Sequence, residues 1–208
     1  MRTLVIDTAT EACSVALFDG LALIAGDHAE LGRGHAERLV PMIAALPDRG
    51  RAGRIMVNLG PGSFTGIRVG IAAARALGLA WDAPVGGYHC LDLVAAMARA
   101  AAHDPDGAID VVMTGGHGEW FFQPFAASGL PAGAPVSLPP ADVIARATAP
   151  LAAGSQADAL ALASGTRALV LRPDARQFAL LPRAAWRDDT APVYGRAPDA
   201  RVRAPAPA

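Results

Sequence analysis

Short apolar runs separated by turn residues dominate the first 25 residues of the chain. Apolar and β-branched residues fill Thr3–Ile6, Cys13–Phe18 and Leu21–Ala25, and Asp19-Gly20 separates the last two runs. An Asp-Gly pair between two apolar runs is a strong signal for a β-hairpin. The pattern therefore predicts an antiparallel meander, and not the strand–helix unit that opens a dinucleotide-binding fold.

Two longer segments follow a helical period. In the first one, His35–Leu46, four large apolar residues recur at helical spacing with His35, namely Leu39, Met42, Ile43 and Leu46. They share one helix face, and Pro41 predicts a kink or a new first turn within this helix. A strand at Ile55–Asn58 and a glycine-rich loop lead to the second predicted helix, Phe64–Trp81, for which Ser63 is a good N-cap.

The rest of the chain predicts a second lobe. A strand at Val85–Tyr88 and a helix at Leu91–Ala102 complete an N-terminal lobe of residues 1–104, and the sequence HDPDG at 103–107 breaks the pattern. The C-terminal lobe spans residues 105–203, and the Ala-Pro tail at 204–208 is predicted to be disordered. The expected elements of the C-terminal lobe are strands Ile109–Met113 and Trp120–Phe125, a loop at 126–140, a helix at Asp142–Thr148 and a strand at Leu169–Leu171.

Composition excludes several classes of enzyme. The chain has 208 residues and a formal net charge of −1, and all 18 of its basic residues are arginine. Without lysine it can have no Walker A loop, no protein-kinase site and no Schiff-base chemistry. An arginine excess at 167–203 indicates either a solvated face or a patch for RNA or an acidic partner. Two cysteines without metal spacing and the lack of a membrane-spanning run predict a soluble, cytoplasmic protein.

The candidate catalytic groups are sparse. The five histidines form no pair with metal-binding helical spacing, so a helical metal site is not expected. Asp7, which ends the first predicted strand, and the threonines Thr8 and Thr10 after it are the best candidates for contact with a nucleotide or metal. A turn role, with the Asp7 side chain bonding its own backbone, is an equal alternative.

The loop NLGPGSFTGIRVG, Asn58–Gly70, fits no standard catalytic motif. A nucleophile elbow needs glycine two positions either side of Ser63, where Pro61 and Thr65 stand. The glycine spacing G-x-G-x-x-x-G is one residue too long for the dinucleotide fingerprint, which leaves a dinucleotide-binding module as a minor alternative. An anion site at the helix start also stays open.

The second helix carries a ridge of small residues at a spacing of four, namely Gly66, Gly70, Ala74 and Gly78. Such a ridge permits close approach of another backbone. Glycines inside a helix cost about 1 kcal/mol each relative to alanine, so a close contact is expected to require them. The contact is either with the protein's own sheet or with a second chain.

Four segments resemble the bacterial TsaB family. They are IDTATEACSVAL at 6–17, HAERLVPMI at 35–43, GPGSFTGIRVGI at 60–71 and PVYGRAPDA at 192–200. The resemblance implies an α/β, actin-like fold (ribonuclease H-like) of two lobes, each a mixed β-sheet flanked by helices.

The resemblance also implies a function. TsaB proteins are non-catalytic accessory subunits that bind and activate a TsaD-type catalytic subunit and work with a TsaE-type ATPase. The complex makes threonylcarbamoyladenosine next to the anticodon of ANN-decoding tRNAs. The chain is then expected to have no cofactor of its own, with ATP and divalent metal in the partner subunits, and to meet tRNA through the complex. A homodimer of the lone chain stays open.

The resemblance places the partner interface on the two N-terminal helices. The expected interface residues are His35, Leu39, Met42, Ile43, Gly66, Ile67, Gly70 and Ala74. Thr114 and Gly116 stand where the family usually has an acidic residue and an arginine, which weakens any nucleotide-related role of the second lobe. The alternative function is a stand-alone ATPase or peptidase-like enzyme of the same fold, for which Asp7 would be needed.

Overall fold

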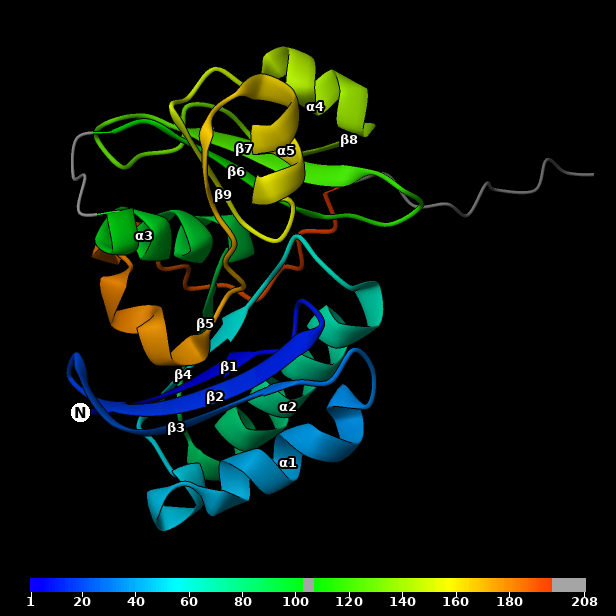
Figure 1. The fold of residues 1–208 in the computed structure, drawn as a ribbon. Helices are drawn as coiled ribbons and strands as arrows, with labels where there is room; N and C mark the ends of the chain where they lie inside the picture. Colours follow the sequence, from blue (N-terminus) through cyan, green and yellow to red (C-terminus); the bar gives the residue numbers. More distant parts are fainter. Residues whose placement is uncertain (103–106, 196–208) are drawn as a thin grey trace, which may run out of the picture.

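The computed structural model describes residues 1–102 and 107–195, which form two five-stranded sheets with helices against both (Figure 1). The expected lobe boundary at 103–107 falls almost entirely outside the described residues, and the expected tail at 204–208 falls wholly outside them.

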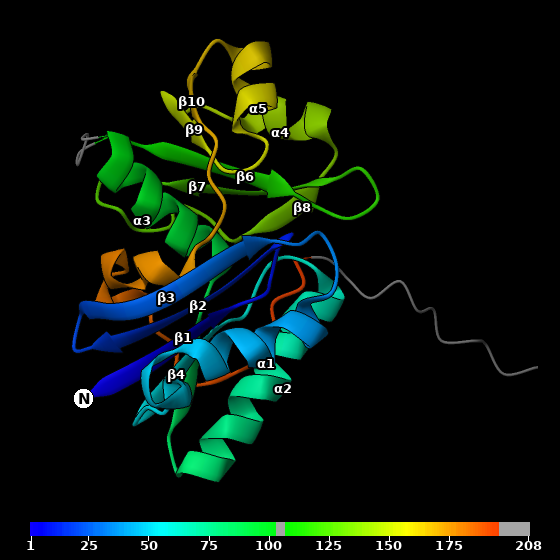
Figure 2. The same cartoon turned by 60° about the horizontal axis from the view of Figure 1, so that its bottom comes forward.

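The first sheet has the strand order β3-β2-β1-β4-β5. Its strands are β1 (Arg2–Asp7), β2 (Ala12–Asp19), β3 (Ala22–Glu30), β4 (Arg54–Asn58) and β5 (Val85–Tyr88). The predicted antiparallel meander is confirmed for β1, β2 and β3, whereas β4 and β5 run parallel to β1. The helices α1 (His35–Ala45) and α2 (Phe64–Trp81) lie side by side on one face (Figure 2). The helix α1 is continuous with Pro41 inside it, so Pro41 does not begin a new helix.

The central strands of this sheet are buried on both faces. Leu4 and Ile6 of β1 belong to the core under α1 and α2, while Val5 between them belongs to the core on the opposite face. That opposite core is closed by Phe178 of η2 (Ala175–Leu180), whose ring lies 5.3 Å from that of Tyr88. The C-terminal segment, which also includes η3 (Arg183–Ala185), therefore returns to the first sheet.

The second sheet repeats the topology of the first, with the order β10-β9-β6-β7-β8. Its strands are β6 (Ile109–Thr114), β7 (Trp120–Phe125), β8 (Val136–Leu138), β9 (Leu151–Ala153) and β10 (Arg167–Leu169). Again an antiparallel meander is followed by two strands parallel to its first strand. The helices α4 (Pro140–Arg146) and α5 (Ala157–Ser164) cover one face, and α3 (Cys90–Ala102) packs on the other.

Candidate functional site

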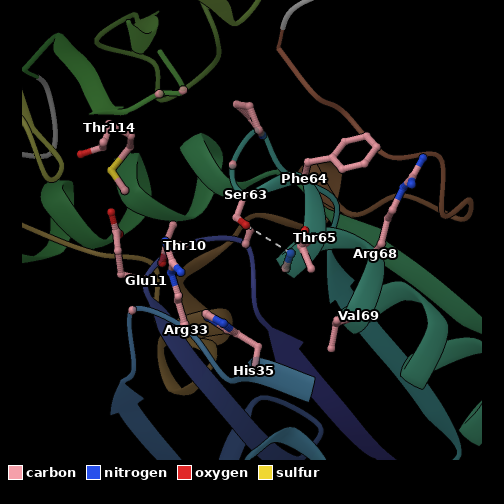
Figure 3. A pocket seen from close by; sticks show the side chains of 18 of the residues that line it. Thr10, Glu11, Arg33, His35, Ser63, Phe64, Thr65, Arg68, Val69 and Thr114 are labelled. Atoms are coloured by element: carbon pink, nitrogen blue, oxygen red, sulfur yellow. Dashed lines mark hydrogen bonds between the residues drawn. The ribbon is translucent and has the colours of Figure 1, made fainter. Parts of the chain in front are cut away.

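A cleft of about 1100 Å³ opens between the two sheets (Figure 3). From the first lobe it is lined by the β1–β2 turn, the loop into α1 and the start of α2. The second lobe contributes residues 113–117, at the end of β6 and in the turn after it, together with Phe121 and Ser155. Thr10, Glu11, Arg33 and His35 lie along one side of the cleft. Because β1 and β6 hold the same place in their sheets, equivalent turns of the two lobes face each other across this cleft.

The glycine-rich turn brings α2 against the β1–β2 turn. A Cβ atom at Gly62 would overlap the carbonyl oxygen of Ala9, and one at Gly66 would overlap that of Thr8. The Ser63 N–H donates to the Ala9 carbonyl at 2.7 Å, and Ser63 Oγ accepts from the Gly66 N–H at 3.2 Å, which confirms the predicted N-cap. The loop thus needs its glycines for backbone contact within the protein, so no phosphate ligand is required to explain them.

Asp7 is tied into the protein interior. Its side chain is 1% exposed and accepts hydrogen bonds from Asn58 Nδ2 at 2.7 Å, from the Tyr88 hydroxyl at 3.0 Å and from the Ala9 N–H at 3.2 Å. Burial raises the pKa of Asp7 to about 6, although these hydrogen bonds lower it in part. The Asn58 Oδ1 in turn accepts from the Gly60 N–H at 2.8 Å. Asp7 therefore positions the glycine-rich turn through Asn58.

Of the three residues predicted to touch a nucleotide, only Thr10 lines the cleft. Thr8 is fully buried and its hydroxyl donates to the Gly66 carbonyl at 2.7 Å. Asp7 and Thr8 do not line the cleft and are hydrogen-bonded inside the protein, so their positions give the predicted nucleotide contact no support. The local turn bond that was the alternative for Asp7 is present, as the contact from Ala9.

The actin-like fold implies a nucleotide with a divalent cation between the lobes, and the donors of this cleft do not fit one. Such a cation binds several oxygen ligands, mostly carboxylates. Within residues 1–102 and 107–195, no group of three histidine, cysteine or acidic side chains could hold a metal ion. Among the described residues, Glu11 and Glu37 line the cleft without a third such ligand beside them, and the buried Asp7 carboxylate is held by its three donors.

Replacing Asp7 by asparagine tests this structural role. Because its pKa is raised from 3.8 to about 6, Asp7 stabilises the fold most below pH 4 and loses this contribution as the pH rises through 6. The unfolding free energy of wild type minus that of Asp7→Asn should therefore fall between pH 4 and pH 7, by up to about 3 kcal/mol. Denaturant unfolding at both pH values measures it, with Asp142→Asn as a control for one lost charge. An equal difference at both pH values would contradict the assignment.

All eight residues predicted to form a partner interface are buried in the chain itself. His35 Nε2 lies 3.3 Å from the Ala12 carbonyl, and Leu39, Met42 and Ile43 belong to the core under the first sheet. A Cβ atom at Gly70 would overlap Thr8 Oγ1. The ridge on α2 therefore packs against its own sheet, and in the lone chain these eight residues face its core and not solvent.

The outward faces of α1 and α2 carry the residues that a partner could touch. Val40 is 62% exposed, Leu79 is 88% exposed and Phe64 is 52% exposed. Six of the twelve other exposed positions of α1 and α2 are alanine, namely Ala36, Ala44, Ala45, Ala72, Ala76 and Ala80, and four are charged, namely Glu37, Arg38, Arg68 and Arg75. We call this surface the helix face. The sequence contained a signal for it, since Val40 and Leu79 are large apolar residues outside the apolar stripe of their helices.

Two mixed sheets of one topology, flanked by helices and separated by a cleft, define a two-lobed α/β protein of the actin-like class. The solved structure of YeaZ from Pseudomonas aeruginosa matches with a TM-score of 0.72 at 26% identity, covering 86% of this chain and 89% of that one. The ethanolamine utilization protein EutJ from Carboxydothermus hydrogenoformans shares the fold, with a TM-score of 0.51 at 13% identity.

Within this class the chain is a relative of the TsaB proteins, and the resemblance predicted from the sequence is confirmed. It is 42% identical over 97 residues to the tRNA threonylcarbamoyladenosine biosynthesis protein TsaB of Escherichia coli, which is 44% of this chain and 41% of that protein. The Bacillus subtilis TsaB is 33% identical over 104 residues, 48% of this chain and 45% of that protein. The chain thus matches less than half the length of these relatives. Residues 29–129 also match the family TsaD, tRNA N6-adenosine threonylcarbamoyltransferase.

Proposed function

We propose that the chain is a non-catalytic accessory subunit of a complex that makes threonylcarbamoyladenosine in tRNA. It binds and activates a TsaD-type catalytic subunit, works with a TsaE-type ATPase and meets tRNA through the complex. ATP and divalent metal belong to the partner subunits. The names of the TsaB relatives support the pathway, and the buried Asp7 with its three donors supports a role without catalysis.

The helix face is the main structural support for partner binding. Two adjacent helices expose Val40, Leu79 and a set of alanines to solvent on the side away from the cores. Small side chains allow another helix to approach closely, and exposed large apolar residues gain about 1.5–3 kcal/mol each when a partner covers them fully. Among the described residues no helix is long and apolar enough to cross a membrane. We propose a protein partner as the occupant of this face, because its alanines permit close helix packing and its exposed large residues are apolar.

Size-exclusion chromatography with light scattering tests the proposal. The chain should be eluted as a stable one-to-one complex when mixed with the TsaD-type protein of its own organism, and neither the transferase nor the ATPase activity should appear with the chain alone. A folded chain that forms no complex would remove the accessory role. Binding of ATP to that lone chain in calorimetry would then favour the alternative, a stand-alone enzyme that uses the cleft.

A further inference from the structure

A narrow groove of about 230 Å³ lies between α2 and the C-terminal segment 190–194. Its apolar lining comes from Ile71, Ala72 and Pro192. Arg68 and Arg75 also line it, and their seven-residue spacing places them about 10 Å apart along the helix. The groove borders the outward side of α2, so it is continuous with the helix face.

Both arginines are held in place by the C-terminal segment without a carboxylate. The Arg75 guanidinium donates to Thr190 Oγ1 from Nε at 3.0 Å and from Nη2 at 2.7 Å. The Arg68 Nε donates to the Tyr194 hydroxyl at 3.2 Å, and its guanidinium lies 3.8 Å above the Phe64 ring. The Tyr194 and Phe64 rings are themselves 4.9 Å apart. These contacts fix the direction of two long side chains before any partner arrives.

Neither arginine forms an ion pair within the described part of the chain. The ion pairs there involve other basic groups, and α2 has no acidic residue along its 18 residues. In the same ranges, both Nη groups of Arg68 and the Nη1 of Arg75 make no hydrogen bond. Guanidinium groups with free donors pair with carboxylates through short, charge-assisted hydrogen bonds. Pre-positioning reduces the conformational entropy that such a pairing costs.

We propose that this groove is the cationic part of the docking surface, where Arg68 and Arg75 pair with two carboxylates of the TsaD-type subunit. The inference rests on the proposed function and deepens it. The alanines and Leu79 give the surface its apolar contact, while the two arginines fix the register of the partner, because only carboxylates spaced about two helical turns apart can meet both. The C-terminal segment is thereby a positioning element of the interface.

Calorimetry with Arg68→Gln, Arg75→Gln and the double variant tests the inference. Each single variant should weaken the complex about tenfold, since a hydrogen bond to a charged group is lost. The double variant should also lose most of the salt dependence of binding. The control is Arg183→Gln, because Arg183 is likewise stacked on an aromatic ring, 3.9 Å over Trp186. Trp186 packs against the core on the opposite face of the first sheet, away from the groove. It should bind like wild type.

The outcomes separate this inference from the proposed function. If the double variant binds like wild type with unchanged salt dependence, the carboxylate pairing is overturned and the helix face remains. If wild type forms no complex, the proposed function itself has failed. If the glutamine variants fail to fold, the charge-conserving double variant Arg68→Lys and Arg75→Lys tests the inference in their place. It should keep the salt dependence but bind more weakly than wild type, because lysine lacks the guanidinium fork.

Discussion

Replacing Gly70 by valine should unfold the protein at moderate temperature. A Cβ atom at Gly70 would overlap Thr8 Oγ1 and lie 3.3 Å from Val57 Cγ2, both fully buried. Thr8 cannot move away without losing its 2.7 Å hydrogen bond to the Gly66 carbonyl. Overpacking combined with a lost buried hydrogen bond is expected to cost about 3–5 kcal/mol, a large part of the stability of an ordinary domain.

Thermal unfolding measures this effect against a matched control. For a chain of this size, each kcal/mol lowers Tm by about 2–4 °C, so Gly70→Val should lower Tm by roughly 10 °C or more. Ala72→Val adds the same β-branched side chain two residues along the same helix at an exposed position and should change Tm little. A Gly70→Val protein with native Tm that only loses its partner would show that the ridge faces outward.

The sequence predicted the position of α2 well, but it did not predict whether the ridge of small residues faces the core or a partner. Its bounds, Phe64–Trp81, and the Ser63 cap agree with the prediction because capping and periodicity are local properties. The spacing of the small ridge shows that something approaches closely, but it carries no information on what does. The contacts of Thr8 with Gly66 and Gly70 show that the ridge faces the sheet, and they join residues about 60 positions apart in the sequence.

The role of Asp7 likewise could not be predicted from local sequence. A carboxylate at the end of a first strand could be read as a ligand or as a turn residue from local sequence. Its strongest partners, Asn58 and Tyr88, come from β4 and β5, which lie beside β1 only after the parallel part of the sheet has formed. Local patterns cannot predict that these three side chains meet in the interior.

The second lobe was the least predictable part of the fold. β8, β9 and β10 have three residues each, too few for a period of two to stand out from chance, and neither β8 nor β9 was predicted. The helix α5 has the sequence ADALALAS, whose alanines blur its apolar face, and it was also missed. For this reason the repeat of one topology in both sheets is visible in the structure and not in the sequence.

Placing a charge on the helix face should have the largest effect on binding. Val40→Asp combined with Leu79→Asp should weaken the complex with the TsaD-type subunit at least about 100-fold. Two apolar contacts of about 1.5–3 kcal/mol each are lost, and two carboxylates are buried against a partner that was shaped for apolar groups. The folded chain itself should keep its Tm, because Val40 is 62% exposed and Leu79 is 88% exposed.

Light scattering and calorimetry on the purified complex measure this loss, and Leu162→Asp is its control. Leu162 is 91% exposed on α5 of the second lobe, so it is a leucine of matching exposure on a different surface. Since its replacement also adds a carboxylate, a general effect of negative charge would appear in both proteins. Loss of the complex in the double variant alone would locate docking on the helix face. Equal binding by all three proteins would place the partner elsewhere, and the groove beside α2 would then lose its role as well.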